Sequence, residues 1–76
     1  MKAFFTTQEL SKILNVSTSL LDKLAMKNAD KTHPLYIKFF SNGGYRLYNT
    51  TAIKSKLIEL GTDEKTAEEI LSQFDF

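Results

Sequence analysis

Two adjacent glycines, Gly43 and Gly44, separate two segments that both have the character of β-strands. Residues 36–40 are aromatic and β-branched, which favours a strand, and residues 45–48 follow as the return strand. Residues 41–44 form the turn, because Asn-Gly and Gly-Gly pairs supply the positive φ angles that a tight hairpin needs. The sequence therefore predicts a β-hairpin near the middle of the chain.

A first helix is predicted over residues 7–14, after a short apolar segment at residues 4–5 that can form one β-bridge. Thr6 and Glu9 have the spacing of a capping box, in which each side chain accepts a hydrogen bond from the backbone N–H of the other. Asn15 suits the left-handed conformation that commonly ends a helix. Local signals therefore mark both ends of this helix.

A second helix is predicted over residues 18–27, with Ser17 as its N-cap. Residues 28–34 are polar and end in the only proline, so we expect a loop there. The turn between the two helices is only residues 15–17, which is typical of a helix-turn-helix. One face of the second helix carries three leucines: Leu20, Leu21 and Leu24.

Two more helices are predicted after the hairpin. Asn49 caps the third and Gly61 ends it, and Thr62 caps the fourth. Their apolar stripes are Ile53, Leu57 and Leu60, and then Ala67, Ile70, Leu71 and Phe74. The predicted fold is one domain over residues 1–76, mainly α with a small β-hairpin, in the order helix-helix-hairpin-helix-helix.

The net charge of +1 hides an uneven distribution. Residues 1–61 carry nine basic and four acidic side chains, a net charge of +5. Residues 62–76 carry one basic and five acidic side chains, a net charge of −4. A basic body suggests a polyanionic partner, and an acidic C-terminal segment accompanies it.

The composition argues against several classes of protein. There is no cysteine, and the single histidine, His33, can form neither a metal site nor a catalytic dyad by itself. We therefore expect no enzyme, no metal and no cofactor, and we interpret the pair Glu68-Glu69 as a solvated face. No apolar run approaches the roughly 20 residues that span a bilayer, and no signal peptide is recognisable. A cytoplasmic protein without a membrane partner is expected.

The chain resembles the DNA-binding domain of MerR-type regulators and their small relatives, the phage-type excisionases. Residues 6–17 carry the resemblance for the helix-turn-helix. Residues 44–49, GYRLYN, match the family pattern G-Y-R-x-Y followed by a helix cap. Residues 60–62, followed by Glu68-Glu69-Ile70, resemble the leucine-glycine step and acidic fourth helix of that domain. The likeness covers nearly the whole chain, which is identified as a small stand-alone member without the family's dimerisation helix or ligand sensing.

The resemblance implies a winged helix-turn-helix that binds double-stranded DNA as a small transcriptional regulator or an excisionase-type, recombination directionality factor. The second helix would lie in the major groove, and residues 41–46 would form a wing on the backbone or minor groove. The DNA-binding residues that it implies are Thr18, Ser19, Lys23, Lys27, Lys38, Asn42, Gly43, Tyr45 and Arg46.

Arg46 and Tyr45 suit phosphate chemistry. The guanidinium of Arg46 is a permanent cation with a planar fork of donors, and the Tyr45 hydroxyl can donate to a phosphate oxygen. Successive strand residues point to opposite faces, so these two side chains should diverge. The alternative for Arg46 is a surface salt bridge, for example to Glu59. Its replacement by alanine should weaken binding to all sequences alike and flatten the salt dependence by about one contact.

Other residues on the predicted contact face have competing interpretations. Asp22 is unusual for the family at a DNA-facing position, where it would accept from a cytosine amino group or pair with Lys23. Leu20 is interpreted as a core residue, with a thymine methyl contact as the alternative. The hairpin aromatics are interpreted as core rather than as base-stacking platforms: Tyr36, Phe39 and Tyr48.

The acidic C-terminal segment has two interpretations. Residues 71–76 can contact a second copy of the chain on DNA repeats, or an integrase; alternatively, Phe74 simply closes the core. A different function is also open, in which the domain is a protein-interaction module, an inhibitor or adaptor that does not depend on DNA. The acidic segment, Asp22 and the modest net charge favour it. A continuous positive stripe of Lys23, Lys27, Lys38 and Arg46 would favour DNA, whereas an acidic interruption and an apolar patch near Phe74 and Phe76 would favour protein.

Overall fold

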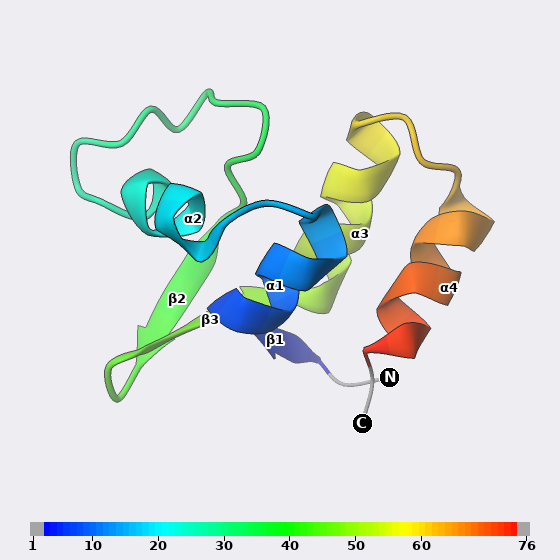
Figure 1. Cartoon of the computed structure of the whole chain (residues 1–76), viewed down its shortest axis with the longest axis horizontal. Coiled ribbons are helices and arrows are strands. Elements are labelled where there is room, and N and C mark those ends of the chain that lie inside the picture. Colours follow the sequence, from blue (N-terminus) through cyan, green and yellow to red (C-terminus); the bar gives the residue numbers. More distant parts are fainter. Residues whose placement is uncertain (1–2, 75–76) are drawn as a thin grey trace.

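The computed structural model describes residues 3–74, and the side chain of Asn42 is not described within that range. The described residues form four helices and a three-stranded antiparallel sheet in the order β-α-α-β-β-α-α (Figure 1). The elements are β1 (Phe4–Thr6), α1 (Thr7–Leu14), α2 (Thr18–Leu24), β2 (Phe39–Asn42), β3 (Tyr45–Asn49), α3 (Thr50–Glu59) and α4 (Glu64–Gln73). The predicted mixture of four helices and a hairpin is present, but the hairpin belongs to a larger sheet, because residues 4–6 form a strand and not an isolated bridge.

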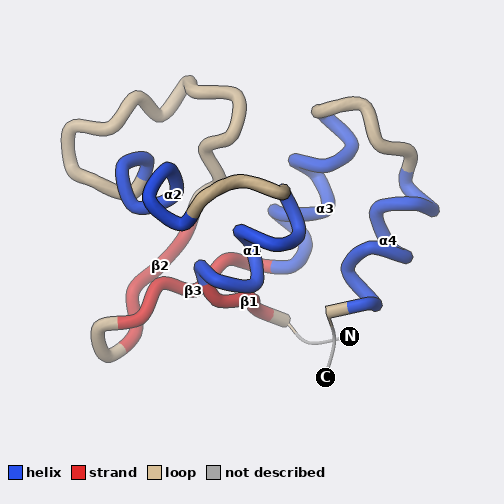
Figure 2. Tube along the Cα trace, in the orientation of Figure 1, coloured by secondary structure: helices blue, strands red, loops and turns tan. Residues whose placement is uncertain are grey.

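β3 is the central strand of the sheet, with β1 on one side and β2 on the other (Figure 2). Tyr48 lies opposite Phe5 of β1 and opposite Phe39 of β2. The turn between β2 and β3 consists of Gly43 and Gly44, whose φ angles are 59° and 89°. Two consecutive positive φ angles are what a type I′ turn requires, so this turn depends on its glycines.

β2 begins later than predicted, at Phe39 rather than at residue 36. The length of a strand is set by its partner, and the last pair along this hairpin is Phe39 with Tyr48. The next residue of β3, Asn49, caps α3, so β3 offers no further partner to residues 36–38. Ser41 and Asn42, predicted as turn residues, belong to β2 and pair with β3.

The first two helices are fixed by their caps. The capping box is present, with the Thr6 N–H donating to Glu9 Oε1 at 2.9 Å and the Glu9 N–H donating to Thr6 Oγ1 at 3.3 Å. Asn15 ends α1 in the left-handed conformation, at φ 56° and ψ 48°. The Ser17 hydroxyl accepts from the N–H of Leu20 at 3.2 Å and begins α2. These predictions are confirmed.

α2 is three residues shorter than predicted and ends at Leu24. Beyond it, the N–H groups of Ala25 and Met26 donate to the carbonyls of Asp22 and Lys23, three residues back, which tightens the last turn. The apolar face also stops at Leu24, because Lys27 and Asn28 would follow it. A helix is stabilised in a protein chiefly by its buried face, so α2 ends where that face ends.

The third and fourth helices pack against each other across Gly61, whose φ is 109°. Asn49 caps α3 as predicted, since its Oδ1 accepts from the N–H groups of Thr51 and Ala52. The predicted cap of α4 was wrong by one residue. Asp63, and not Thr62, accepts from the N–H of Thr66 at 3.1 Å.

The core joins the sheet to all four helices. Its largest fully buried members are Phe5, Leu10, Ile53 and Leu71, which come from β1, α1, α3 and α4. Leu21 of α2 and Tyr48 of β3 are also buried in it. In Figure 1, α2 and the β2–β3 hairpin occupy one side of the molecule, and α3 and α4 occupy the other. The exposed face of α2 therefore points away from the α3–α4 pair.

Candidate nucleic-acid interface

The exposed face of α2 carries most of the side chains that the sequence predicted there. Leu21 and Leu24 are buried, whereas Lys23 and Asp22 are exposed, because a helical period places them on opposite sides. Lys23 makes no ion pair with the described residues. The predicted contact residues Thr18 and Ser19 are exposed too, and Leu20 is half-buried without joining the buried core.

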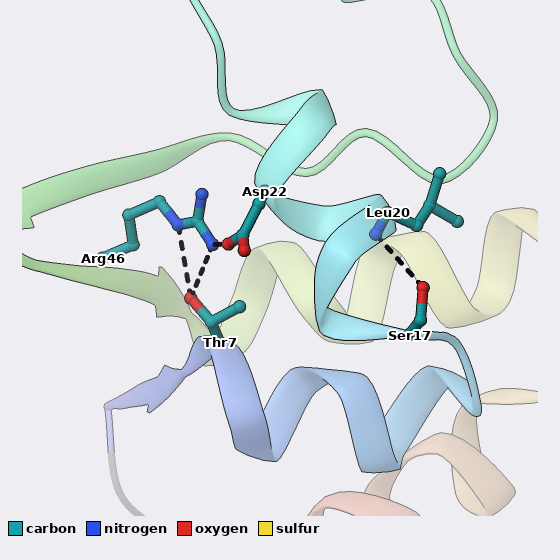
Figure 3. A network of polar contacts seen from close by, with 5 residues as sticks. All are labelled: Thr7, Ser17, Leu20, Asp22 and Arg46. Carbon is teal, nitrogen blue, oxygen red and sulfur yellow. Dashed lines mark hydrogen bonds and ion pairs between the residues drawn. The ribbon is translucent and has the colours of Figure 1, made fainter.

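Arg46 is bound to two helices (Figure 3). Its Nη2 donates to Asp22 Oδ1 of α2 in an ion pair, and its Nε and Nη2 donate to Thr7 Oγ1 of α1 at 3.2 and 3.1 Å. The Arg46 side chain is only 19% exposed, whereas that of Asp22 is 65% exposed. The guanidinium also lies over the ring of Phe39, 5.9 Å from its centroid, within the range of a cation–π contact.

Strand alternation explains why Arg46 faces inward. Tyr48 is buried on the helix-covered face of β3, and Arg46, two residues before it, points to the same face. Tyr45 points to the other face and is 71% exposed. The predicted divergence of Tyr45 and Arg46 is therefore present, with Arg46 turned towards α2.

The ion-pair partners differ from those considered from the sequence. Arg46 pairs with Asp22 and not with Glu59, which instead pairs with Lys56 at 3.4 Å. Asp22 correspondingly pairs with Arg46 and not with Lys23. An acidic group thus stands beside Arg46 and interrupts the positive stripe that would have favoured DNA, which is the arrangement that the protein-interaction alternative predicted at this point.

The Arg46 link also bears on Tyr48. Burial raises the pKa of the Tyr48 phenol, while the charge of Arg46 and a side-chain hydrogen bond with Thr7 oppose that rise. Burial disfavours the phenolate because a charged group loses its hydration in the interior. The phenol therefore stays un-ionised beside a guanidinium whose charge is already compensated by Asp22.

A groove runs beside this link, between the glycine turn and the beginnings of the first two helices. Its walls are polar, and one side of it carries the Arg46–Asp22 pair. Its other lining residues are Thr6, Thr7, Gln8, Thr18, Gly44 and Tyr45. Three predicted contact residues, Thr18, Tyr45 and Arg46, therefore surround one depression. Gly43 lies at the tip of the same turn, and the Asn42 side chain lies outside the described part of the structure.

The predicted contact residues Lys27 and Lys38 lie elsewhere. Both are exposed, and both line a separate groove at the C-terminal end of α2. The candidate residues thus fall into two groups, one beside the hairpin and one after α2. Lys31, which was not singled out from the sequence, lines the second groove with them.

The acidic C-terminal helix is partly compensated by α3. Lys54 Nζ lies 2.6 Å from Glu68 Oε1 and 3.2 Å from Glu64 Oε1, and hydrogen bonds to these two carboxylates raise the pKa of Lys54. Phe74 is half-buried and packs against the core, as one interpretation of the sequence held. Asp75 and Phe76, named with it for a partner contact, lie outside the described residues.

The outer face of the sheet carries exposed aromatic side chains that the sequence-based analysis missed. Phe4 and Phe40 meet edge to face with ring centroids 4.9 Å apart, and they are 37% and 46% exposed. Tyr45 belongs to the same face, because it alternates with the inward Arg46. The signal in the sequence was the pair of doublets, Phe4-Phe5 and Phe39-Phe40, since adjacent strand residues cannot both face the core.

The remaining features of residues 3–74 concern His33, metal binding and membrane spanning. His33 has a local role, accepting the N–H of Leu35 on its Nδ1 at 3.0 Å. No three His, Asp or Glu side chains in the described range gather closely enough to hold a metal ion. None of the helices described here has the length and apolar character needed to cross a membrane. No family model, no curated protein and no solved structure matches the chain, so the site must be interpreted from its own geometry.

Proposed function

We propose that this chain is a winged helix-turn-helix protein that binds double-stranded DNA sequence-specifically, as a small transcriptional regulator or an excisionase-type factor. α2 would enter the major groove, which is wide enough for a helix. Residues 41–46 of the hairpin would rest on the neighbouring backbone or minor groove. No cofactor or catalytic chemistry is part of this proposal.

The pairing of α1 and α2 supports the proposal. The helices are joined by residues 15–17, and α2 is held to the core by Leu21 and Leu24. On its opposite side, Ser19 and Lys23 are exposed. A recognition helix needs this arrangement, since one side must be anchored while the other reaches base edges.

The observation that carries the proposal is the placement of unpaired cations. Lys23, Lys27 and Lys38 are exposed around α2 and β2, and none forms an ion pair among residues 3–74. By contrast, Lys54 and Lys56 of α3 are paired with carboxylates. Lys12 of α1 and Lys65 of α4 are exposed and unpaired among the described residues as well, but the three lysines around α2 and β2 concentrate positive charge there, which attracts a polyanion.

The hairpin adds a point of close approach. Nothing lies within 4 Å of a Cβ placed on Gly43 or Gly44, so the turn projects into open space. The exposed Tyr45 hydroxyl can donate to a phosphate oxygen. Arg46 can reach a phosphate with Nη1, the guanidinium nitrogen that has no hydrogen bond within the described residues. Arg46 would then bind Asp22 through Nη2 and a DNA phosphate through Nη1 at the same time.

Fluorescence anisotropy with a mixed-sequence duplex at several salt concentrations tests the proposal. We expect log K to fall linearly with log salt, with a slope of roughly −3 to −5, as a few phosphate contacts give. Lys23→Gln should flatten the slope by about 0.9. Lys65→Gln on α4 is the matched control, since it removes one exposed charge far along the chain from α2, and it should leave the slope unchanged. Absence of binding at low salt would refute the proposal.

A second function, that of a protein-interaction module, is favoured by the outer face of the sheet. The exposed Phe4 and Phe40 side chains, which contact each other, form an apolar surface that DNA does not require. Phe40→Ser would remove the centre of this surface without touching the lysines. Unchanged DNA affinity together with loss of a protein complex from a pull-down would favour the second function.

A further inference from the structure

A groove of about 400 Å³ follows α2 and is lined by three lysines; we call it the lysine groove. Lys27 lies just after α2, Lys31 lies in the loop, and Lys38 directly precedes β2. The remaining lining residues are Leu24, Ala25, Met26, Tyr36 and Phe39. The groove therefore combines an apolar floor with three cationic side chains drawn from separate parts of one loop.

Among residues 3–74, no carboxylate lines the lysine groove. Lys27, Lys31 and Lys38 are exposed, and none is ion-paired within the described residues. The acidic residue closest in sequence, Asp30, accepts from the backbone N–H of Thr32 at 2.9 Å and also from its hydroxyl. Asp30 thus shapes the loop and, among the described residues, forms no ion pair with the groove lysines, although hydrogen bonds from Thr32 lower its pKa and keep it ionised.

Hydrogen bonds order the loop that supplies the lysines. The N–H of Tyr36 donates to the carbonyl of His33 at 2.9 Å, and the N–H of His33 donates to that of Asp30 at 3.1 Å. The floor is anchored as well, because the ring of Phe39 packs on that of Tyr48 with centroids 5.8 Å apart. The backbone that carries Lys31 is therefore ordered, and the three lysines line one groove.

Three like charges around one groove repel one another. The C-terminal end of α2 offsets part of this repulsion, because its carbonyls carry partial negative charge. The partial negative charge at one helix end can stabilise one nearby cation, but not three. A bound anion would compensate the rest, and Lys is a strongly hydrated point charge that suits phosphate oxygens.

We propose that each of the three lysines of the lysine groove contacts a backbone phosphate of duplex DNA, and that together they supply most of the salt-dependent affinity of this chain. The inference rests on the proposed function and extends it, since it assigns Lys31 and a second contact region at the end of α2. A phosphate fits better than an acidic peptide because the groove continues from the helix proposed to enter the DNA. Because Arg46 is already paired with Asp22, it contributes little to the salt-dependent affinity.

The test is the salt dependence of duplex binding for Lys31→Gln and for the triple variant Lys27→Gln/Lys31→Gln/Lys38→Gln. Lys31→Gln should flatten the slope by about 0.9, and the triple variant by about 2.7. Lys65→Gln, which removes a charge on α4, should leave it unchanged. Circular dichroism melts monitor folding, and the single variant keeps the test valid if the triple variant unfolds.

The possible outcomes separate this inference from the proposed function. If the wild type binds DNA with a steep slope and the lysine variants keep that slope, the groove is not the phosphate site, but the proposed function stands. If the wild type binds no duplex at any salt concentration, both fail. Polyglutamate serves as a probe for an acidic protein partner. Loss of polyglutamate binding in the triple variant, with duplex binding intact, would overturn the phosphate assignment.

Discussion

The two sides of α2, the hairpin side with Arg46 and the side of the loop that follows the helix, use cationic side chains in different ways. Beside the hairpin, Arg46 is mostly buried, and it joins β3 to α2 and α1 through Asp22 and Thr7. After α2, Lys27 and Lys31 extend into solvent without a carboxylate partner. Arginine suits phosphate best, yet Arg46 is less accessible to a phosphate than Lys27 and Lys31 are. In the proposed complex, Arg46 mainly stabilises the fold, whereas the lysines mainly supply the electrostatic attraction to DNA.

The largest expected effect is on folding, from Arg46→Ala. The variant loses hydrogen bonds to Thr7, the pair with Asp22 and the contact with Phe39, and the free energy of unfolding should fall by about 1–3 kcal/mol. Urea unfolding followed by circular dichroism measures it. Arg46→Lys keeps the charge but not the planar fork, so it should recover only part of the loss. Wild-type stability in Arg46→Ala would show that the link is not structural.

A smaller effect, on binding, is expected from Asp22→Asn. The change removes a negative charge from the proposed DNA face and releases the charge of Arg46, so the salt slope should steepen by about 0.9 and affinity should rise several-fold. Anisotropy titrations at matched salt concentrations measure both. Because Asp22 is largely exposed, stability should change by no more than about 1 kcal/mol. An unchanged slope would place the Arg46 side of α2 away from DNA altogether.

At alkaline pH, the Arg46 side should lose stability through Tyr48. Burial raises the pKa of Tyr48 above its ordinary value, so the folded state favours the un-ionised phenol. The resulting stabilisation is fully present below the unfolded pKa of about 10 and is lost as pH rises through the folded pKa. Urea unfolding between about pH 8 and pH 11 should therefore show a fall that is shallower in Tyr48→Phe. Parallel curves for the two proteins would contradict this assignment.

The smallest effect is expected from Lys31→Ala on folding. The side chain is exposed and makes no ion pair within residues 3–74, so the free energy of unfolding should change by less than about 0.5 kcal/mol. The same urea experiment as for Arg46→Ala checks it. Clear destabilisation would mean that the lysine groove also holds the loop, and the contrast between the two sides of α2 would weaken.

Local features of the fold were predictable from the sequence because the relevant interactions are local. The capping box of Thr6 and Glu9, the left-handed Asn15 and the N-cap at Asn49 each involve residues within a few positions of one another. The glycine turn was equally visible, since positive φ at two successive residues favours glycine. Propensity failed at the end of α2, where the buried face and not the residue type sets the boundary.

The candidate site was less predictable because its contacts are distant in sequence. Arg46 and Thr7 are 39 positions apart, and Arg46 and Asp22 are 24 apart. Residue type alone could indicate that Arg46 would bind an anion, but not whether that anion belonged to the protein or to a ligand. The lysine groove was missed for a similar reason, since Lys31 gains its significance only when the loop folds back beside Lys27 and Lys38.

The central position of β3 has a consequence for how the chain reaches its fold. This strand pairs with both β1 and β2, carries the link to the first two helices, and ends at the cap of α3. Phe4 pairs opposite Asn49, so the sheet closes only after the chain has been synthesised through β3. Such long-range pairing slows folding relative to local helix formation. During translation, α1 and α2 therefore emerge before the strand whose Arg46 links them.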